Sequence, residues 1–297
     1  MDDDTPVLVG GTGRSGSTVV GRLLDVHPEL TLMRPMEVRF ITGNDGFADA
    51  LASARKKPGS SAAHEAAERA VDRLLHRWYR RAENVGLHQS IDIDTVNSLC
   101  DAYLAQFDRS PLEATTALVH PIMDAIARRL GAGRWVDTTP ANARNADRVE
   151  PIYPRSRVVV VIRDGRDVAI SFASQSFGPD DPFEALRLWE KRMLRAHRAA
   201  LASTPGRVHV VDLADLVRLS RQQTLGDLLA FAQVDPDPLV QSWFDAHMSA
   251  EAAHVGRWRS ELDRTTATRL DADYAAACDR LRAAGVRIPV SDDGSRG

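Results

Sequence analysis

The chain has 297 residues, of which 43% are hydrophobic and 27% charged, with a formal net charge of −3. This length can bury one substantial core with a helical cap, and the composition is ordinary for a soluble globular protein. The mild negative charge leaves no basic field for nucleic acid or an anionic membrane surface, so neither is expected as a partner.

The first predicted element is a strand at residues 7–9, whose apolar run is typical of buried parallel strands. A glycine-rich turn, GGTGRSGST, follows it and leads into an amphipathic helix at 19–26. Free backbone N–H groups and the positive end of the helix dipole converge there, so the turn predicts an anion site. The residues expected to hold the anion are Gly13, Arg14, Ser15, Gly16, Ser17 and Thr18.

The turn resembles the Walker A pattern but lacks its lysine. Gly11, Gly16 and Thr18 have the Walker spacing, whereas Ser17 occupies the lysine position. Because that lysine contacts the β- and γ-phosphates, we interpret the turn as a phosphate cradle that does not handle a triphosphate. This argues against a P-loop kinase, which remains the first alternative.

The remaining pattern predicts an α/β fold with a P-loop-type parallel sheet flanked by helices. Four further strands are expected, at 30–33, 134–137, 157–162 and 208–211, with RVVVVI at the centre of the sheet. Residues 44–132 are predicted to form a mostly helical insert, with helices at 63–81, 95–107 and 111–130. Later helices are expected at 142–149, after the strand at 157–162 through Ser174, around Leu186–Ala196 and in the tail. We predict one domain over 1–297, with the insert capping one side of the sheet.

A second anion-binding segment follows the strand at 157–162, where the chain reads RDGRDVAIS. Ligands of open parallel sheets bind at the carboxyl ends of the strands, so this segment and the first turn should share one cleft. Arg163 and Ser171 are placed to hold one phosphate from two sides. Two phosphate sites in one cleft suit a nucleotide with phosphates at both ends of its ribose. The alternative is an exposed ion pair of Arg163 with Asp164 or Asp167.

With these motifs in order, the chain resembles the sulfotransferases that use 3′-phosphoadenosine 5′-phosphosulfate (PAPS). GTGRSGST resembles their 5′-phosphosulfate loop, and VVVVIRDGRDVAIS their 3′-phosphate segment. HVGRW resembles the loop that closes over the 3′-phosphate, which adds Arg257 and Trp258 to the expected contacts. The resemblance implies in-line transfer of a sulfuryl group to a hydroxyl group, with PAPS as donor and Arg14 stabilising the developing charge. No metal is implied, and the sequence has no metal-ligand cluster.

The resemblance also suggests a general base. Tyrosylprotein sulfotransferases and several bacterial relatives carry a glutamate soon after an L-D-x-H-P segment, which here is followed by Glu37. Glu29 is the competitor, and an ion pair with Arg34 or Arg39 is the structural alternative for Glu37. The family often has a lysine where Thr138 stands. Without it, more of the charge that develops during transfer would be stabilised by Arg14 and by the hydroxyl groups of Ser17, Thr18, Thr138 or Thr139.

The sequence does not name the acceptor, which we expect to be a small molecule, a specialised metabolite or a sugar. His88 and Asp92 of the insert are candidates for lining its pocket, whereas four tryptophans, Trp78, Trp135, Trp189 and Trp243, are assigned to the core. A non-catalytic binder of PAPS or of its desulfonated product is the second alternative. The acidic N-terminus and the absence of a long apolar stretch predict a cytoplasmic location. The oligomeric state stays open, a homo-oligomer included.

Overall fold

The computed structural model describes residues 5–175 and 178–290 and contains a five-stranded parallel sheet with the strand order β2-β3-β1-β4-β5. The strands are β1 (Val7–Gly11), β2 (Leu30–Leu32), β3 (Arg134–Asp137), β4 (Arg157–Ile162) and β5 (Val208–Asp212). All five predicted strands are confirmed. The middle strand is β1 rather than β4, because Val7 pairs with Val136 of β3 on one side and Arg157 of β4 on the other.

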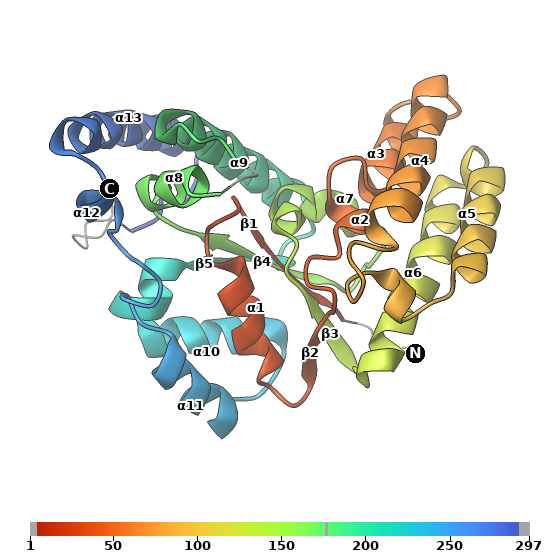
Figure 1. Ribbon diagram of the computed structural model, residues 1–297, viewed down its shortest axis with the longest axis horizontal. Helices are drawn as coiled ribbons and strands as arrows, with labels where there is room; N and C mark the ends of the chain where they lie inside the picture. Colours follow the sequence, from red (N-terminus) through yellow and green to blue (C-terminus); the bar gives the residue numbers. More distant parts are fainter. Residues whose placement is uncertain (1–4, 176–177, 291–297) are drawn as a thin grey trace.

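Helices cover both faces of the sheet, as Figure 1 shows. One face packs against α1 (Ser17–Asp25), α10 (Arg221–Ala232) and α11 (Pro238–His247). The other face packs against α8 (Gly165–Ala173), α9 (Pro182–Ala202) and α13 (Arg264–Ala283). Strand β4 shows why two cores form: Val159 and Val161 enter the first, whereas Val158 and Val160 enter the second. The α/β prediction is therefore confirmed.

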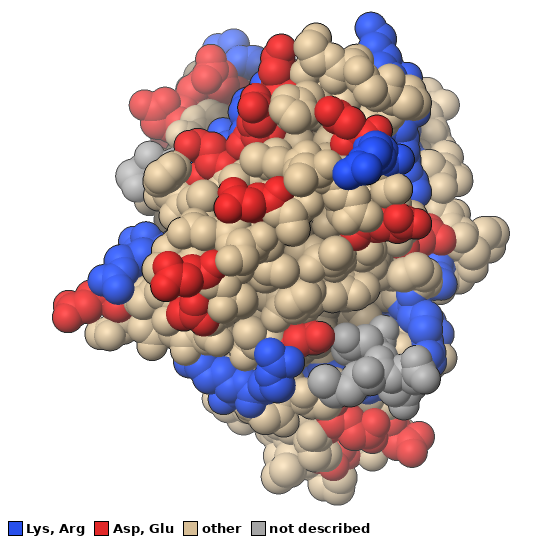
Figure 2. All heavy atoms as spheres, turned by 90° about the vertical axis from the view of Figure 1, so that its right-hand side faces the viewer, with Lys and Arg blue, Asp and Glu red and all other residues tan. Residues whose placement is uncertain are grey.

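The predicted helical insert lies beside the β2 edge of the sheet (Figure 1). Its helices are α3 (Phe47–Lys56), α4 (Ser61–Arg73), α5 (Ile93–Phe107) and α6 (Pro111–Leu130), and the short α2 (Arg39–Thr42) precedes them. Phe47 meets the ring of Tyr103 edge-on at 5.0 Å, which joins α3 to α5. On the outer side of the insert, Figure 2 shows acidic and basic side chains interspersed among uncharged ones.

The structure departs from the predicted helices in two places that border the site. The helix expected over 63–81 ends at Arg73 and continues as a π-helical turn, η1 (Leu74–Trp78), closed by the bond from the Tyr79 N–H to the Leu74 carbonyl. The helix expected over 142–149 begins as the 3-10 turn η3 (Pro140–Asn145) and becomes α7 (Ala146–Val149). The other short elements are η2 (Leu87–Gln89), η4 (Asp215–Leu219) and α12 (Trp258–Glu261).

None of the helices among the described residues combines the length and the apolar character needed to cross a bilayer. The two cysteines, Cys100 and Cys278, are buried and unpaired.

Candidate active site

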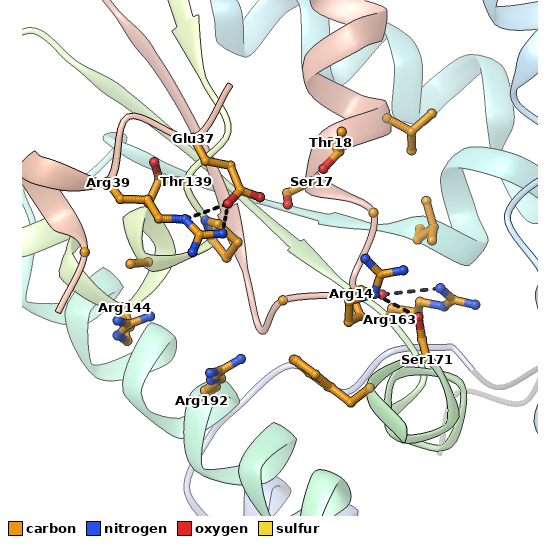
Figure 3. Close-up of a pocket in the computed structure, with 18 of the residues that line it drawn as sticks. Arg14, Ser17, Thr18, Glu37, Arg39, Thr139, Arg144, Arg163, Ser171 and Arg192 are labelled. Atoms are coloured by element: carbon orange, nitrogen blue, oxygen red, sulfur yellow. Dashed lines mark hydrogen bonds and ion pairs between the residues drawn. The ribbon is translucent and has the colours of Figure 1, made fainter. Parts of the chain in front are cut away.

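A cavity of about 900 Å³ opens at the carboxyl ends of the central strands. It is lined by the turn after β1, the residue after β4, the last turn of α8, the segment before α2, η1, η3 and the loop before α12. Figure 3 shows Arg14, Arg163 and Ser171 grouped on one side and Glu37 with Arg39 on the other. The fold thus brings the two predicted anion-binding segments and the predicted base into one cavity.

The turn after β1 has the backbone of an anion cradle. Gly13 (φ 80°) and Gly16 (φ 99°) adopt left-handed conformations, and so does Arg14 (φ 57°), where a side chain makes the conformation costly. Gly10 has no room for a side chain, since an added Cβ would lie 2.3 Å from the Ala143 nitrogen. The chain therefore turns sharply into α1, whose first N–H groups lack intrahelical partners.

The hydroxyl groups of this turn differ in access. Ser17 and Thr18, at the start of α1, line the cavity. Ser15 is fully buried beneath the turn, and its Oγ has no hydrogen-bond partner within the described chain. An added Cβ on Gly11 would lie 2.2 Å from that oxygen. Ser15 thus packs against the β1 end rather than presenting its hydroxyl group to the cavity.

Direct contacts join the two predicted phosphate segments. The Arg14 Nε donates to the Ser171 Oγ at 2.9 Å. The Arg163 guanidinium donates to the carbonyl oxygen of Arg14 at 3.3 Å (Figure 3) and to that of His254 at 2.9 Å. Arg163 therefore connects the first turn to the late loop while remaining part of the cavity lining.

Arg163 is strongly desolvated. Its side chain is 11% exposed, and burial lowers its pKa, with the nearby Arg257 and Arg14 adding to the effect and Asp167 opposing it. Asp167 lies 3.7 Å away and forms an ion pair with it, but this pair is buried, unlike the exposed pair foreseen as the alternative for this loop. The Arg163 Nε has no hydrogen-bond partner among the described residues. A desolvated guanidinium that borders the cavity fits a site for an anion.

The late loop is held in place by Asp167. This buried carboxylate accepts the backbone N–H groups of Gly256 at 2.8 Å and Trp258 at 3.2 Å. Arg257, between them, lines the cavity, with its guanidinium paired to Glu261. The Trp258 side chain does not line the cavity: it is 3% exposed and lies under the Arg166 guanidinium, 4.2 Å from the ring centroid. This geometry does not support the expected contact of the Trp258 side chain with the 3′-phosphate of PAPS.

Glu37 lines the cavity from the segment between β2 and α2. Its φ of 62° is left-handed, as at Arg14, and strain of this kind clusters at functional sites. The Arg39 Nε donates to its Oε2 at 2.7 Å, so the ion-pair alternative for Glu37 is observed with Arg39. No contact to Oε1 is found within the described chain, which leaves that oxygen able to accept a proton. Glu29, the competitor, is exposed and outside the cavity lining.

The Asp137 carboxylate, at the end of β3, fixes the segment that carries Glu37. It accepts the Val38 N–H at 2.8 Å, the Asn142 Nδ2 at 2.8 Å and the Thr139 hydroxyl at 3.1 Å. Burial raises the pKa of Asp137, and these bonds oppose the shift. Asn142 in turn accepts the Thr42 hydroxyl at 2.6 Å. A buried polar network therefore joins β3, η3 and α2 behind the base candidate.

The two threonines after β3 have different positions. Thr139 lines the cavity. Thr138, at the position of the family lysine, is fully buried and outside the lining, with its methyl group against Gly21 of α1. Of these two residues, only Thr139 borders the cavity, and it is itself buried, with its hydroxyl group donated to Asp137 at 3.1 Å.

The insert contributes residues other than those expected. His88 bonds the Tyr79 and Glu83 carbonyl oxygens, and Asp92 caps α5 through the Thr95 N–H; neither lines the cavity. Trp78, assigned to the core from helical spacing, packs against the core and also lines the cavity. The cavity also takes five arginines that the sequence did not single out: Arg73, Arg77, Arg81, Arg144 and Arg192. The i, i+4 spacing of Arg77 and Arg81 was the available signal.

An open parallel sheet with a glycine-rich anion turn at its first strand defines a P-loop-like transferase fold. The sulfotransferase family matches residues 6–238, so this chain belongs to that family and is a transferase. Arg257 and Trp258 lie beyond the matched range. A comparison with curated proteins finds no significant sequence match.

Two solved bacterial sulfotransferase structures share the fold. The sulfotransferase domain from the curacin biosynthetic pathway has a TM-score of 0.55 and 15% identity, over 94% of this chain and 98% of that one. The sulfotransferase domain from the Synechococcus PCC 7002 olefin synthase has a TM-score of 0.53 and 18% identity, over 95% of this chain and 97% of that one. At these identities the likeness concerns the fold.

Proposed function

We propose that the protein transfers the sulfuryl group of PAPS to a hydroxyl group of a small-molecule acceptor, with Glu37 as general base. The observation that carries this proposal is the direct contact of the two anion-binding segments, Arg14 Nε to Ser171 Oγ, in the cavity that Glu37 also lines. One such cavity suits a donor with a phosphate group at each end of its ribose.

The residues present fit this donor. The left-handed Gly13 and Gly16, the start of α1 and the hydroxyl groups of Ser17 and Thr18 form the cradle for the 5′-phosphosulfate. The desolvated Arg163 guanidinium borders the cavity beside Arg14 and Ser171. Arg163, Ser171 and Arg257 would hold the 3′-phosphate. We leave the side chains of Ser15 and Trp258 out of the proposed contacts because both are buried away from the cavity.

The donor supplies the sulfuryl group, and the acceptor oxygen displaces the bridging phosphate oxygen in line. Glu37 would accept the hydroxyl proton at Oε1, since Arg39 holds Oε2. Arg14 and the N–H groups of the turn would stabilise the charge that develops on the transferred and leaving groups. Thr139 lines the cavity, with its hydroxyl group donated to Asp137.

Ligand-induced stabilisation separates this proposal from a kinase. Adenosine 3′,5′-bisphosphate should raise the melting temperature, because a ligand that binds only the folded state stabilises it by mass action. ATP with magnesium should do much less, since Ser17 stands where a triphosphate loop has lysine. Equal stabilisation by both would favour the kinase. Transfer of label from PAPS to an acceptor mixture then separates an enzyme from a non-catalytic binder.

A further inference from the structure

The cavity has far more positive charge than its own residues neutralise. Nine arginines line it, and Glu37 is the one carboxylate among the described lining residues. Three of these arginines, Arg14, Arg163 and Arg257, belong to the proposed donor site. The six others surround the remaining space: Arg39, Arg73, Arg77, Arg81, Arg144 and Arg192.

Two of these six already have acidic partners: Arg39 pairs with Glu37, and Arg73 pairs with Asp45 at 2.8 Å. The other four have none within the described chain, and we call them the acceptor arginines: Arg77, Arg81, Arg144 and Arg192. Three of them bond neutral oxygen atoms: Arg144 that of the Asn44 side chain at 2.7 Å, Arg81 the Met36 carbonyl at 3.2 Å, and Arg192 the Thr12 carbonyl.

Burial and mutual repulsion act on three of the acceptor arginines. Burial, with smaller contributions from Arg144 and Arg195, lowers the pKa of Arg192 to about 10. The pKa of Arg144 is lowered by burial and by Arg195, with Asp49 opposing. The pKa of Arg81 is lowered by burial and by Arg39, with Glu37 opposing. Desolvation and mutual repulsion both raise the free energy of these cations. A bound anion offsets both effects, so the cavity favours the binding of an anion.

The abundance of arginine in this chain does not by itself explain the cluster. Arginines outside the cavity are either exposed to solvent, as Arg22 and Arg198 are, or paired with carboxylates, as in Arg280 with Glu190 at 2.7 Å. On the outer side of the insert, acidic and basic groups are interspersed (Figure 2). The acceptor arginines instead share one cavity, in which Glu37 is the one carboxylate among the described lining residues.

The π-helical turn places one part of the cluster near the base candidate. Arg77 and Arg81 both stack on Trp78, with their guanidinium carbons 5.5 and 5.3 Å from the ring centroid. The bond from Arg81 to Met36 fixes it beside Glu37, the next residue. Arg144 and Arg192 approach from η3 and α9, on the other side of the turn tip from Arg14 (Figure 3).

We propose that the acceptor is itself an anion, an inference that rests on the proposed function. It carries, besides the hydroxyl group that receives the sulfuryl group, a carboxylate, phosphate or sulfate group bound by the acceptor arginines. A guanidinium matches each of these groups with two parallel N–H donors, which makes arginine the suitable residue for all three. A neutral alcohol or phenol of the same shape would leave these cations unpaired.

The test uses matched probes on protein saturated with adenosine 3′,5′-bisphosphate. Calorimetry compares hydroquinone with 4-hydroxybenzoate and 4-hydroxyphenyl phosphate, and glucose with glucuronate and glucose 6-phosphate. We expect an anionic member to bind about 10- to 100-fold more tightly than its neutral partner, as charged hydrogen bonds imply. The carboxylate and phosphate arms identify the anion. Neutral members that bind as well in both series would overturn the proposal.

Variants assign the preference to residues. The double change Arg77→Gln/Arg81→Gln should reduce the preference for the anionic probe to a few-fold. The double change Arg144→Gln/Arg192→Gln should also reduce this preference. Arg80→Gln is the matched control, because Arg80 is exposed on the neighbouring turn outside the cavity lining and should leave the preference unchanged. A preference that survives both double changes contradicts the assignment. If the wild type did not bind adenosine 3′,5′-bisphosphate, the proposed donor would be contradicted. That outcome is distinct from an absent preference for anionic acceptors.

Discussion

The Asp137 carboxylate accepts the backbone N–H of Val38 at 2.8 Å, which connects a buried strand end directly to the residue after Glu37. The same carboxylate holds Thr139, which lines the cavity. A fully buried group thus positions two cavity residues from different parts of the chain without touching the cavity itself.

Replacing this carboxylate should therefore affect both stability and turnover. Asp137→Ala leaves the N–H of Val38 and the amide of Asn142 without their buried acceptor, at a cost of about 1–3 kcal/mol for each unsatisfied group. Urea unfolding should show this loss, and kcat should fall while bisphosphate affinity stays within a few-fold. Asp101→Ala, which removes an exposed carboxylate from α5, is the control. An unchanged kcat in a folded Asp137→Ala protein would show that the network does not position Glu37.

The Glu37→Gln change tests the base. It keeps the size and most hydrogen bonding of the side chain but removes proton acceptance, so kcat should fall by about 10²–10⁴ with donor affinity nearly constant. The loss should shrink along a series of phenols of increasing acidity, because an acidic hydroxyl group needs less help to lose its proton. Glu29→Gln, an exposed glutamate close by in sequence, should match the wild type. A lower melting temperature with an equal loss for all phenols would instead assign Glu37 to the ion pair with Arg39.

A pH dependence of stability is expected from Asp212, the last residue of β5. It accepts the N–H groups of Ala214 at 3.0 Å and Val290 at 2.6 Å, and burial raises its pKa from the ordinary value of 3.8 to about 6. Because the folded pKa lies above the unfolded one, the stability contribution is complete below about pH 4. It is lost as the pH rises through about 6, by on the order of 3 kcal/mol.

Urea unfolding between pH 4 and 7 measures this slope. The free energy of unfolding of the wild type should fall relative to that of Asp212→Asn, which cannot ionise at this position. A difference between the two proteins that stays constant across this range would mean that Asp212 does not titrate there.

The sheet and both anion-binding segments were predictable because they depend on local patterns. Runs such as VLV and RVVVVI can satisfy their backbone and bury their side chains only inside a sheet, and parallel strand ends meet at one edge. The acceptor side was not predictable in this way. Trp78 has the spacing of a core residue, but the π-helical turn after Arg73 redirects it and Arg77 to the cavity. Arg144 and Arg192 join them only through tertiary packing.

The donor site is tested most directly by the affinity of Arg163→Ala for two nucleotides. By calorimetry, the variant should bind adenosine 3′,5′-bisphosphate about 10- to 100-fold more weakly than the wild type, since it lacks a charged donor to the 3′-phosphate. Its affinity for adenosine 5′-phosphate should stay within about twofold, and Arg198→Ala, an exposed arginine of α9, should change neither. Equal weakening of both nucleotides would contradict the account, because Arg163 would then act only by holding the carbonyl groups of Arg14 and His254.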